Sequence, residues 1–269
     1  MVAKTLSFLR DGGLIDPHAV FTYQHDPKPR KTVTNSDYDF LHFLGRVAEE
    51  ELVDSALAWL KGRGLVAPEA SYDKERFRRL RYQVKTSFIV PGTSLSPVME
   101  RLLYALSAVK RPQKMIAIGI FCGYTLVWSA GSSCGKGKVY AADAILGIDI
   151  AQEAVELARR NFSTLESAGH IQLLAEDGLA VADRIGHDCD YLYLDADNEQ
   201  LGKGLCAELL RTYYPMLKKG AWVLAHDTTY PKLRKQLAEY FELVSNDDLF
   251  SATCSFPIDA YGLELSVKR

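Results

Sequence analysis

Long apolar runs are missing from this 269-residue sequence. No stretch approaches the roughly 18 consecutive apolar residues that a membrane-spanning helix requires, so no membrane partner is expected. The first residues also lack an apolar stretch long enough for a signal peptide. Both absences predict a cytoplasmic protein.

Cysteine is scarce as well: the chain has five, and no two of them form a C-x-x-C pair. An odd set without that spacing argues against a disulfide framework and against a zinc site. Reduced thiols in a cytoplasm are expected instead, and most of them should act as small buried hydrophobic side chains.

Neither sign of charge dominates. The formal net charge is −2 and apolar residues make up 48% of the chain, values typical of a soluble globular protein. Such a small net charge gives no electrostatic reason to expect a nucleic-acid partner. The local basic run at residues 74–81, KERFRRLR, is interpreted as a solvated helix face, with an anion-binding patch as the alternative.

The two halves of the chain differ in pattern. Before residue 110 the sequence shows helical signals and one extended, proline-containing segment, but no series of strands. Helices are predicted from a capping box at Ser36 and Asp39, over residues 72–86, and from Pro97 in the first turn of a third helix.

We therefore divide the chain into a helical N-terminal extension, residues 1–93, and a second domain, residues 94–269. The extension has too many apolar positions to be a free tail. It is expected to form a lid over a binding site, a contact between the two subunits of a homodimer, or both.

After residue 110, short apolar runs alternate with amphipathic segments. Strands are predicted at 114–119, 138–143, 171–176, 190–195, 221–227, 241–245 and 262–268. The alternation predicts an α/β fold with a doubly wound, mostly parallel, Rossmann-like sheet of seven strands and helices on both faces. Because only a loop, 246–260, is predicted between the last two runs, these two should pair antiparallel at one edge.

The first predicted strand ends in the turn GIFCGYT, residues 119–125. Glycine accepts positive φ and lets a ligand approach the backbone, and the helix that follows offers free N–H groups to an anion. Gly119 and Gly123 alone indicate no more than a tight turn. The dinucleotide fingerprint G-x-G-x-x-G is absent, which argues against NAD or FAD.

This turn resembles the first motif of class I S-adenosylmethionine-dependent methyltransferases. It is especially similar to the catechol and caffeoyl-CoA O-methyltransferase group, whose turn reads G-x-(aromatic)-x-G-Y-(Ser/Thr), and the resemblance covers about residues 95–269. It implies S-adenosylmethionine as cofactor. It also implies a cofactor site that includes Phe121, with Tyr124 and Thr125 beside the methionine moiety.

In that family an acid at the end of the second strand binds the ribose hydroxyls. Asp143 ends the predicted strand 138–143 and is the first choice. Asp149 is the second choice, because its surroundings also resemble the family pattern and LGID could itself be the strand. Asp149 could also simply cap the helix that follows it.

The family's adenine-binding position corresponds to Asp177, with the backbone of Gly178 nearby. The adenine amino group needs an acceptor and a ring nitrogen needs a donor, which these two residues would supply. An N-cap for the helix predicted over 178–186 is the alternative, and Asp177 could serve both roles.

Two acids, Asp195 and Asp197, follow the fourth predicted strand, beside the expected sulfonium. In metal-dependent members of the group an aspartate here binds Mg²⁺ or Ca²⁺, and an Asp-Asn pair after the fifth strand completes the ligands. This chain has Asp227 and Thr228 at that pair. A metal site of Asp195, Asp227 and Thr228 is one interpretation, since hard cations take oxygen ligands; a metal-free site is the other.

The catalytic candidates are Asp195, His226 and Asp197. The family has a lysine three residues after its metal aspartate, whereas this chain has Asn198, which cannot accept a proton. His226 or Asp197 is therefore the expected base, if one is needed; a buried, hydrogen-bonded imidazole is the alternative for His226. Ala117, where the family has an acid two residues before the first glycine, is a second departure.

The leading hypothesis is methyl transfer from S-adenosylmethionine to a hydroxyl of a small organic molecule in secondary metabolism. A metal-independent N- or C-methyltransferase on the same fold is the second. An NAD-type oxidoreductase and a non-catalytic binding module are the alternatives from other classes.

Overall fold

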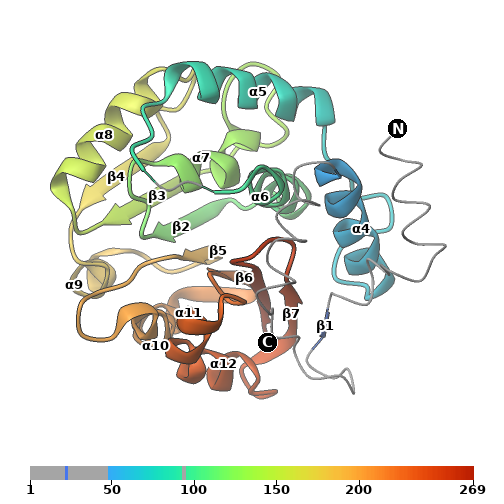
Figure 1. Ribbon diagram of the computed structural model, residues 1–269, viewed down its shortest axis with the longest axis vertical. Coiled ribbons are helices and arrows are strands. Elements are labelled where there is room, and N and C mark those ends of the chain that lie inside the picture. The colour runs from blue at the N-terminus through green and yellow to red at the C-terminus, as the bar shows by residue number, and fades with distance from the viewer. Residues whose placement is uncertain (1–21, 24–47, 93–94) are drawn as a thin grey trace.

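The computed structural model describes residues 22–23, 48–92 and 95–269. In these residues an eight-stranded mixed sheet lies between two layers of helices (Figure 1), with strand order β1-β7-β8-β6-β5-β2-β3-β4. The strands are β1 (Thr22–Tyr23), β2 (Lys114–Ile118), β3 (Ala144–Asp149), β4 (Ile171–Ala175), β5 (Cys189–Leu194), β6 (Leu217–His226), β7 (Phe250–Phe256) and β8 (Leu263–Lys268).

The helices confirm the predicted alternation. They are α4 (Glu49–Gly62), α5 (Lys74–Ser87), α6 (Pro97–Lys110), α7 (Tyr124–Ala130), α8 (Gln152–Ser163), α9 (Gly178–Val181), α10 (Leu205–Tyr213), α11 (Pro231–Gln236) and α12 (Ala238–Val244), with 3₁₀ turns η1 (Gly131–Ser133), η2 (Ala182–Arg184), η3 (Gly202–Gly204) and η4 (Tyr214–Met216). The helices predicted over 72–86 and from Pro97 are α5 and α6. Ser96 caps α6 through its hydroxyl, which accepts from the N–H of Met99. The capping box predicted at Ser36 and Asp39 lies outside the described residues.

Five strands, β2 to β6, run parallel and are covered on both faces. β2 shows how the sequence achieves this. Met115 and Ala117 point into the core shared with α4 to α8, whereas Ile116 and Ile118 point into the core shared with α9, α10 and α12. Because successive side chains alternate between faces, a strand buried on both sides is a continuous apolar run. The predicted doubly wound, mostly parallel sheet is confirmed.

The second strand is not where it was first predicted. Residues 138–143 form no strand, and β3 instead begins at Ala144, which pairs with Lys114. Tertiary packing selects the later run. A Cβ on Gly147 would lie 2.7 Å from Leu126 and 2.9 Å from Leu173, so only glycine fits between α7 and β4 at this register. The second strand is therefore the alternative named from the sequence, the run that contains LGID and ends at Asp149.

The prediction for residues 241–245 is also wrong, because they lie at the end of α12. Tyr240 and Val244 are buried four residues apart, at helical spacing. The next strand, β7, lies inside the segment predicted to be a loop, 246–260. Its sequence, FSATCSF, does alternate apolar with polar residues, the period of a strand, but most of these side chains are small and the apolar signal is weak. Antiparallel pairing with β8 is what makes it a strand.

The two described N-terminal helices belong to the main core. Trp59 of α4 packs edge-on against Phe256 of β7 with ring centroids 5.8 Å apart. Phe77 of α5 packs against Trp128 of α7 at 5.9 Å. In Figure 1, α5 lies across the layer that contains α7 and α8. These helices therefore thicken one face of the sheet.

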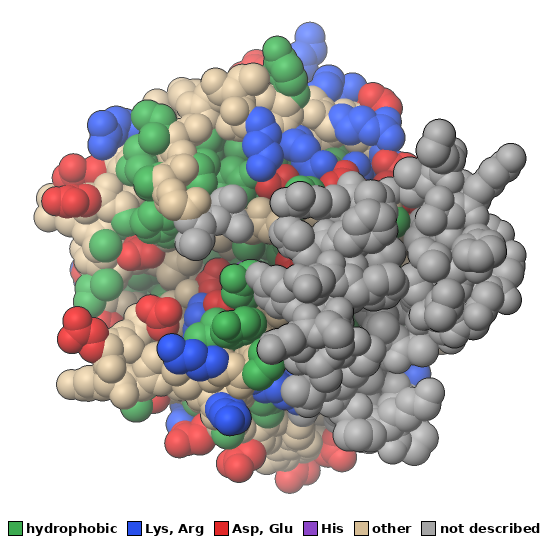
Figure 2. Space-filling view, viewed as in Figure 1, with side chains coloured by type: hydrophobic (Ala, Val, Ile, Leu, Met, Phe, Trp, Pro, Cys, Tyr) green, Lys and Arg blue, Asp and Glu red, His purple; other side chains and the backbone are tan. Residues whose placement is uncertain are grey.

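The basic run of α5 lies on the outside of the molecule, where Lys and Arg side chains gather in Figure 2. Its cations face the acids of α4: Lys74 pairs with Glu50 at 3.1 Å, and Arg81 pairs with Glu49 at 2.7 Å. The run is a helix face, as interpreted from the sequence. Among the described residues, no helix has the length and the apolar character needed to cross a membrane.

Candidate active site

The carboxyl ends of the five parallel strands meet at one edge of the sheet, which we call the carboxyl edge. Most of the residues selected from the sequence follow these ends: Gly119 after β2, Asp149 at the end of β3, Asp177 after β4, Asp195 after β5 and Asp227 after β6. Ligands bind at this edge in doubly wound sheets, because the loops there leave a crevice where the strand order reverses.

The glycine turn connects β2 to α7 and needs its glycines. Gly119 has φ of +84°, and a Cβ there would lie 2.6 Å from the backbone of both Asp195 and Ala196. Gly123 has φ of +80°, and a Cβ there would meet the ring of Phe162 at 2.7 Å. Both positions therefore combine left-handed backbone with close packing. The turn lies directly against the residues that follow β5.

Asp149 is held against this turn. Its Oδ2 accepts a hydrogen bond of 2.7 Å from the backbone N–H of Phe121, and its Oδ1 accepts one of 3.0 Å from Ala151. Phe121 itself has positive φ and is 44% exposed. Asp143, the first choice from the sequence, precedes β3 and so lies at the amino end of the strand, away from the turn.

Tyr124 and Thr125 begin α7, but the two side chains differ. Tyr124 is buried, and its hydroxyl donates to the carboxylate of Glu100, which is itself fully buried and pairs with Arg81 and Lys85. Burial and then the neighbouring Glu100 raise the pKa of Tyr124. Thr125 is half-buried in the same first turn. The hydroxyl of Tyr124 is therefore already used in its hydrogen bond to Glu100 of α6.

Asp177 caps α9, with its Oδ1 accepting from the N–H of Leu179 at 2.8 Å. The side chain is exposed at the carboxyl edge. The carbonyl of Gly178 accepts from the hydroxyl of Tyr213 at 2.7 Å. The N-cap interpretation therefore describes the geometry of Asp177, while its carboxylate keeps an exposed side.

Asp195 and Asp227 come together after the neighbouring strands β5 and β6, and a lysine lies between them. The ammonium of Lys203 is 2.5 Å from Oδ1 of Asp195 and 2.7 Å from Oδ2 of Asp227. It also donates to the main-chain oxygen of Asp195 at 3.0 Å. Burial by itself lowers the pKa of Lys203, but the two carboxylates reverse this and raise it above its usual range. The lysine is a fixed cation.

Lys203 was not among the residues selected from the sequence. It lies in η3, eight residues after Asp195 in the sequence. The spacing in the family pointed to Asn198 instead. The available signal was a single cation flanked by two glycines, in a segment close behind the acids of β5. Only the fold shows that this cation turns back toward them.

His226 ends β6 and faces the same two acids. Its Nδ1 is 3.2 Å from Oδ1 of Asp227 and 3.5 Å from Oδ2 of Asp195. Burial alone would lower the pKa of this imidazole, but the carboxylates of Asp195 and Asp227 raise it to about 9. Burial likewise would raise the pKa of Asp195, whereas Lys203 and His226 lower it to about 2. Nε2 of His226 is buried and has no hydrogen-bond partner among the described residues.

Two tyrosines extend the site outward from His226. The ring of Tyr261 stacks on the imidazole with centroids 6.2 Å apart, and the ring of Tyr230 lies 5.6 Å from that of Tyr261. Tyr261 is 39% exposed. An aromatic surface therefore leads from solvent to the buried imidazole.

The other candidates from this region have different surroundings. Asp197 is exposed, and among the described residues no hydrogen bond or ion pair joins its carboxylate to the half-buried Asp195 and Asp227. Asn198 accepts from the N–H of Leu201 at 2.7 Å and so caps the turn that leads to η3. Thr228 is fully buried, and its hydroxyl has no partner among the described residues. Ala117, at the family's acidic position, is part of the β2 core.

The acids as arranged do not fit a divalent cation. Asp195, His226 and Asp227 do place one ligand atom each within 4.8 Å of one another, the spacing of a metal cluster, and the unpartnered hydroxyl of Thr228 would suit an oxygen ligand. However, Mg²⁺ or Ca²⁺ requires roughly six or more oxygens around it. The Lys203 ammonium already lies between the two carboxylates that would supply the first of them. We therefore assign no chemical step to a metal.

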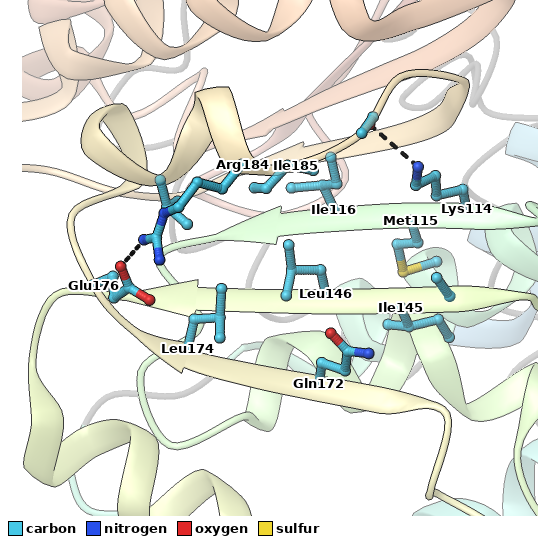
Figure 3. A pocket seen from close by; sticks show the side chains of 13 residues that line it. Lys114, Met115, Ile116, Ile145, Leu146, Gln172, Leu174, Glu176, Arg184 and Ile185 are labelled. Carbon is cyan, nitrogen blue, oxygen red and sulfur yellow. Dashed lines mark hydrogen bonds and ion pairs between the residues drawn. The ribbon is translucent and has the colours of Figure 1, made fainter.

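A separate cavity of about 320 Å³ lies against the sheet between β2, β3, β4 and residues 181–186 (Figure 3). Ile116 and Leu146 point into it, and an ion pair of Arg184 with Glu176 stands at one end. None of the catalytic candidates lines it, so we do not include it in the site.

Residues 116–228 match the family model described as a methyltransferase domain. This segment runs from β2 to the residues that follow β6, and it contains the glycine turn, Asp149, Asp177, Asp195 and Asp227. No curated protein matches the chain by sequence.

Several solved structures share the fold. The O-methyltransferase from Bacillus cereus, solved in complex with SAH, has a TM-score of 0.55 at 13% identity over 74% of this chain and 92% of that chain. The O-methyltransferase TomG from Streptomyces achromogenes, in complex with SAM, has a TM-score of 0.55 at 16% identity, over 74% of this chain and 92% of that chain. The SAH-bound methyltransferase PaMTH1 from Podospora anserina has a TM-score of 0.56 at 12% identity, over 82% of this chain and 96% of that chain.

The fold is that of a class I methyltransferase. The resemblance found in the glycine turn is thereby confirmed at the level of the whole sheet. In this methyltransferase fold the carboxyl edge brings the glycine turn, Asp149 and the group around His226 to one side of the molecule.

Proposed function

We propose that this chain transfers a methyl group from S-adenosylmethionine to a hydroxyl of a small organic molecule. The match to a methyltransferase domain and the O-methyltransferases among the similar structures support the reaction class. The observation that carries the choice of a hydroxyl is His226. Its Nδ1 faces two carboxylates and its buried Nε2 has no partner among the described residues.

The cofactor would lie along the glycine turn. Asp149 would bind the ribose hydroxyls, because its carboxylate is already held against the N–H of Phe121 at the carboxyl edge. The turn itself, with Thr125, would face the methionine moiety. Asp177 and the backbone of Gly178 would face adenine, and Asp195 would lie near the sulfonium. Asp143 has no part in this proposal, because it lies at the opposite end of β3.

In the reaction, the hydroxyl oxygen of the acceptor forms a bond to the methyl carbon while the carbon–sulfur bond of the sulfonium breaks. S-adenosylhomocysteine leaves with the electron pair on sulfur. Nε2 of His226 takes the proton of the hydroxyl, and Asp195 and Asp227 stabilise the imidazolium that results. Most of the acceleration comes from holding oxygen, carbon and sulfur in line.

The acceptor would be an aromatic or similarly flat molecule, because the surface that leads to His226 consists of the rings of Tyr261 and Tyr230. A role in secondary metabolism is proposed from the similarity to TomG, which is described as involved in tomaymycin synthesis. A reducing cytoplasmic location is proposed from the cysteines, all of which are buried and free. A homodimer is proposed on the apolar content of the N-terminal extension.

Calorimetry with S-adenosylhomocysteine and with NAD tests the cofactor. Binding of the first and not of the second is expected. Incubation with S-adenosylmethionine carrying a labelled methyl group and a panel of phenols, alcohols, amines and carbon acids then tests the acceptor by mass spectrometry. O-methylated products support the proposal. NAD binding, exclusive N- or C-methylation, or cofactor binding without turnover on any acceptor would each replace it by one of the alternatives.

A further inference from the structure

The pair of acids at the carboxyl edge has a cation built into the chain. We propose that the ammonium of Lys203 takes the place of a divalent metal between Asp195 and Asp227, and that this site works without metal. The part of the inference that concerns catalysis rests on the proposed function; the part that concerns the cation does not.

The hydrogen bonds of Lys203 are fully used. An ammonium group carries three N–H donors, and Lys203 directs its own to Oδ1 of Asp195, the main-chain oxygen of Asp195 and Oδ2 of Asp227. Only 4% of the side chain is exposed. No donor is left for an acceptor molecule, so Lys203 is a positioning residue that acts through the acids.

The turn that precedes Lys203 fixes the position of this lysine. Asn198 caps the turn, accepting from the N–H of Leu201 with its side chain. The N–H of Lys203 then donates to Oε1 of Gln236 at 2.8 Å, which fixes η3 to the end of α11. Gly202 has φ of +54°, a backbone conformation that favours glycine, and its missing Cβ leaves room for the Gln236 side chain. The position of the ammonium is therefore set by the fold and not by a mobile side chain alone.

Every oxygen of the two carboxylates has a partner. The oxygens not bound by Lys203 face His226, at 3.5 Å for Asp195 and 3.2 Å for Asp227, and the hydroxyl of Tyr193 donates to Asp195 at 3.3 Å. The two carboxylates carry two negative charges, and the Lys203 ammonium already offsets one of them at close range. Adding a divalent cation would place two further positive charges beside a buried lysine, which Coulomb repulsion strongly disfavours.

The ammonium of Lys203 orients the two carboxylates and, through them, the imidazole of His226. Lys203 holds Oδ1 of Asp195 and Oδ2 of Asp227, which leaves the opposite oxygen of each acid turned toward Nδ1 of His226. That arrangement selects the imidazole orientation in which Nε2 is directed away from the acids. A divalent metal would supply Lewis-acid activation of the acceptor as well as charge, whereas Lys203, with its donors used within the chain, supplies charge alone.

Titration of the wild-type protein with Mn²⁺, followed by electron paramagnetic resonance of the free ion, tests the cation directly. No stoichiometric binding up to millimolar Mn²⁺ is expected, and methyl transfer should be unchanged by EDTA. Micromolar binding of one Mn²⁺ that disappears in Asp195→Ala would overturn the inference. S-adenosylhomocysteine calorimetry on the same sample shows separately whether the proposed function stands.

The Lys203→Met variant sharpens the test, because it keeps the bulk and removes the charge. Two acids and His226 are then left without a fixed cation, so this variant should bind Mn²⁺ at least about ten-fold more tightly than wild type. Lys203→Met with Asp227→Asn should lose that binding again. Lys232→Met, which changes an exposed lysine of α11, should behave as wild type. Unchanged Mn²⁺ binding in a folded Lys203→Met protein would count against the proposal.

Kinetics separates positioning from general support of the fold. Lys203→Met should lower kcat far more than it changes KM, and it should move the pH profile to higher pH, because His226 then faces two acids with no competing cation. Circular dichroism verifies that the variant is folded. A loss confined to protein stability, with the pH profile unmoved, would contradict the role assigned to Lys203.

Discussion

The carboxylate of Asp149 accepts a hydrogen bond of 2.7 Å from the backbone N–H of Phe121. This contact ties the end of β3 to the glycine turn that follows β2. It keeps a charged oxygen at the crevice between two parallel strands, where a ribose would lie, and it orients the exposed turn at the same time.

The Asp149→Ala variant is therefore expected to bind S-adenosylhomocysteine about 10- to 100-fold more weakly, since a hydrogen bond to a charged group contributes roughly 1.5–3 kcal/mol. Calorimetry measures the change. Asp143→Ala, at the other end of β3, is the matched control and should bind as wild type. The reverse ranking of these two variants would restore the first choice made from the sequence.

Gly119→Ala should destabilise the protein by roughly 2–4 kcal/mol, because a positive φ and a close backbone contact act together. The new Cβ would lie 2.6 Å from the backbone of Asp195 and Ala196. Urea unfolding gives the free energy of unfolding. Gly169→Ala, where no atom lies within 4 Å of a new Cβ, should change it little; equal effects at the two sites would contradict this account of the turn.

His226→Gln should lower kcat by about 10²- to 10⁴-fold if His226 is the base. The pKa of His226 is raised to about 9, so the imidazole is protonated at neutral pH and becomes a base only as pH rises. The rate of wild type should accordingly increase with pH and level off above about 9, and this rise should be absent in the variant. The pKa of His226 sets the range to be measured, up to about pH 9. A wild-type rate that stays flat from neutral pH to this value would argue against the role of His226 as the base.

The same histidine predicts how stability depends on pH. Its pKa is raised from 6.5 to about 9 on folding, so its contribution is fully present below pH 6.5 and is lost as pH rises through 9. A difference of this size corresponds to about 3 kcal/mol. Urea unfolding of wild type and of His226→Gln across this range should show a fall in wild type that the variant lacks. Parallel curves would exclude the linkage.

Cysteine reactivity gives a test that does not involve the site. All five cysteines are buried and free, and burial raises the pKa of Cys189 and of Cys206 to about 12. Because the thiolate is the reactive form, Ellman's reagent should modify none of them rapidly in the folded protein and all five after denaturation. Rapid labelling under native conditions would show that the core opens.

Much of the fold could be predicted because its signals are local. The run from Met115 to Ile118 is apolar on both faces, and Ser96 with Pro97 marks a helix start; each depends only on neighbours in the chain. The prediction missed β7, although its signal is local too. Its residues from Phe250 to Phe256 alternate apolar with polar, but Ala252 and Cys254 are small, and the segment is held as a strand by its antiparallel pairing with β8.

For the site, the sequence alone determined which residues end the parallel strands: Gly119, Asp195 and Asp227 reach the carboxyl edge because parallel strands end together. Only the tertiary structure decided between Asp143 and Asp149, because the choice depends on which run pairs with β2. It alone placed Lys203 between the two acids. Strand periodicity is a property of nearest neighbours, whereas the distance between side chains from different segments is set by register, packing and the turns between them.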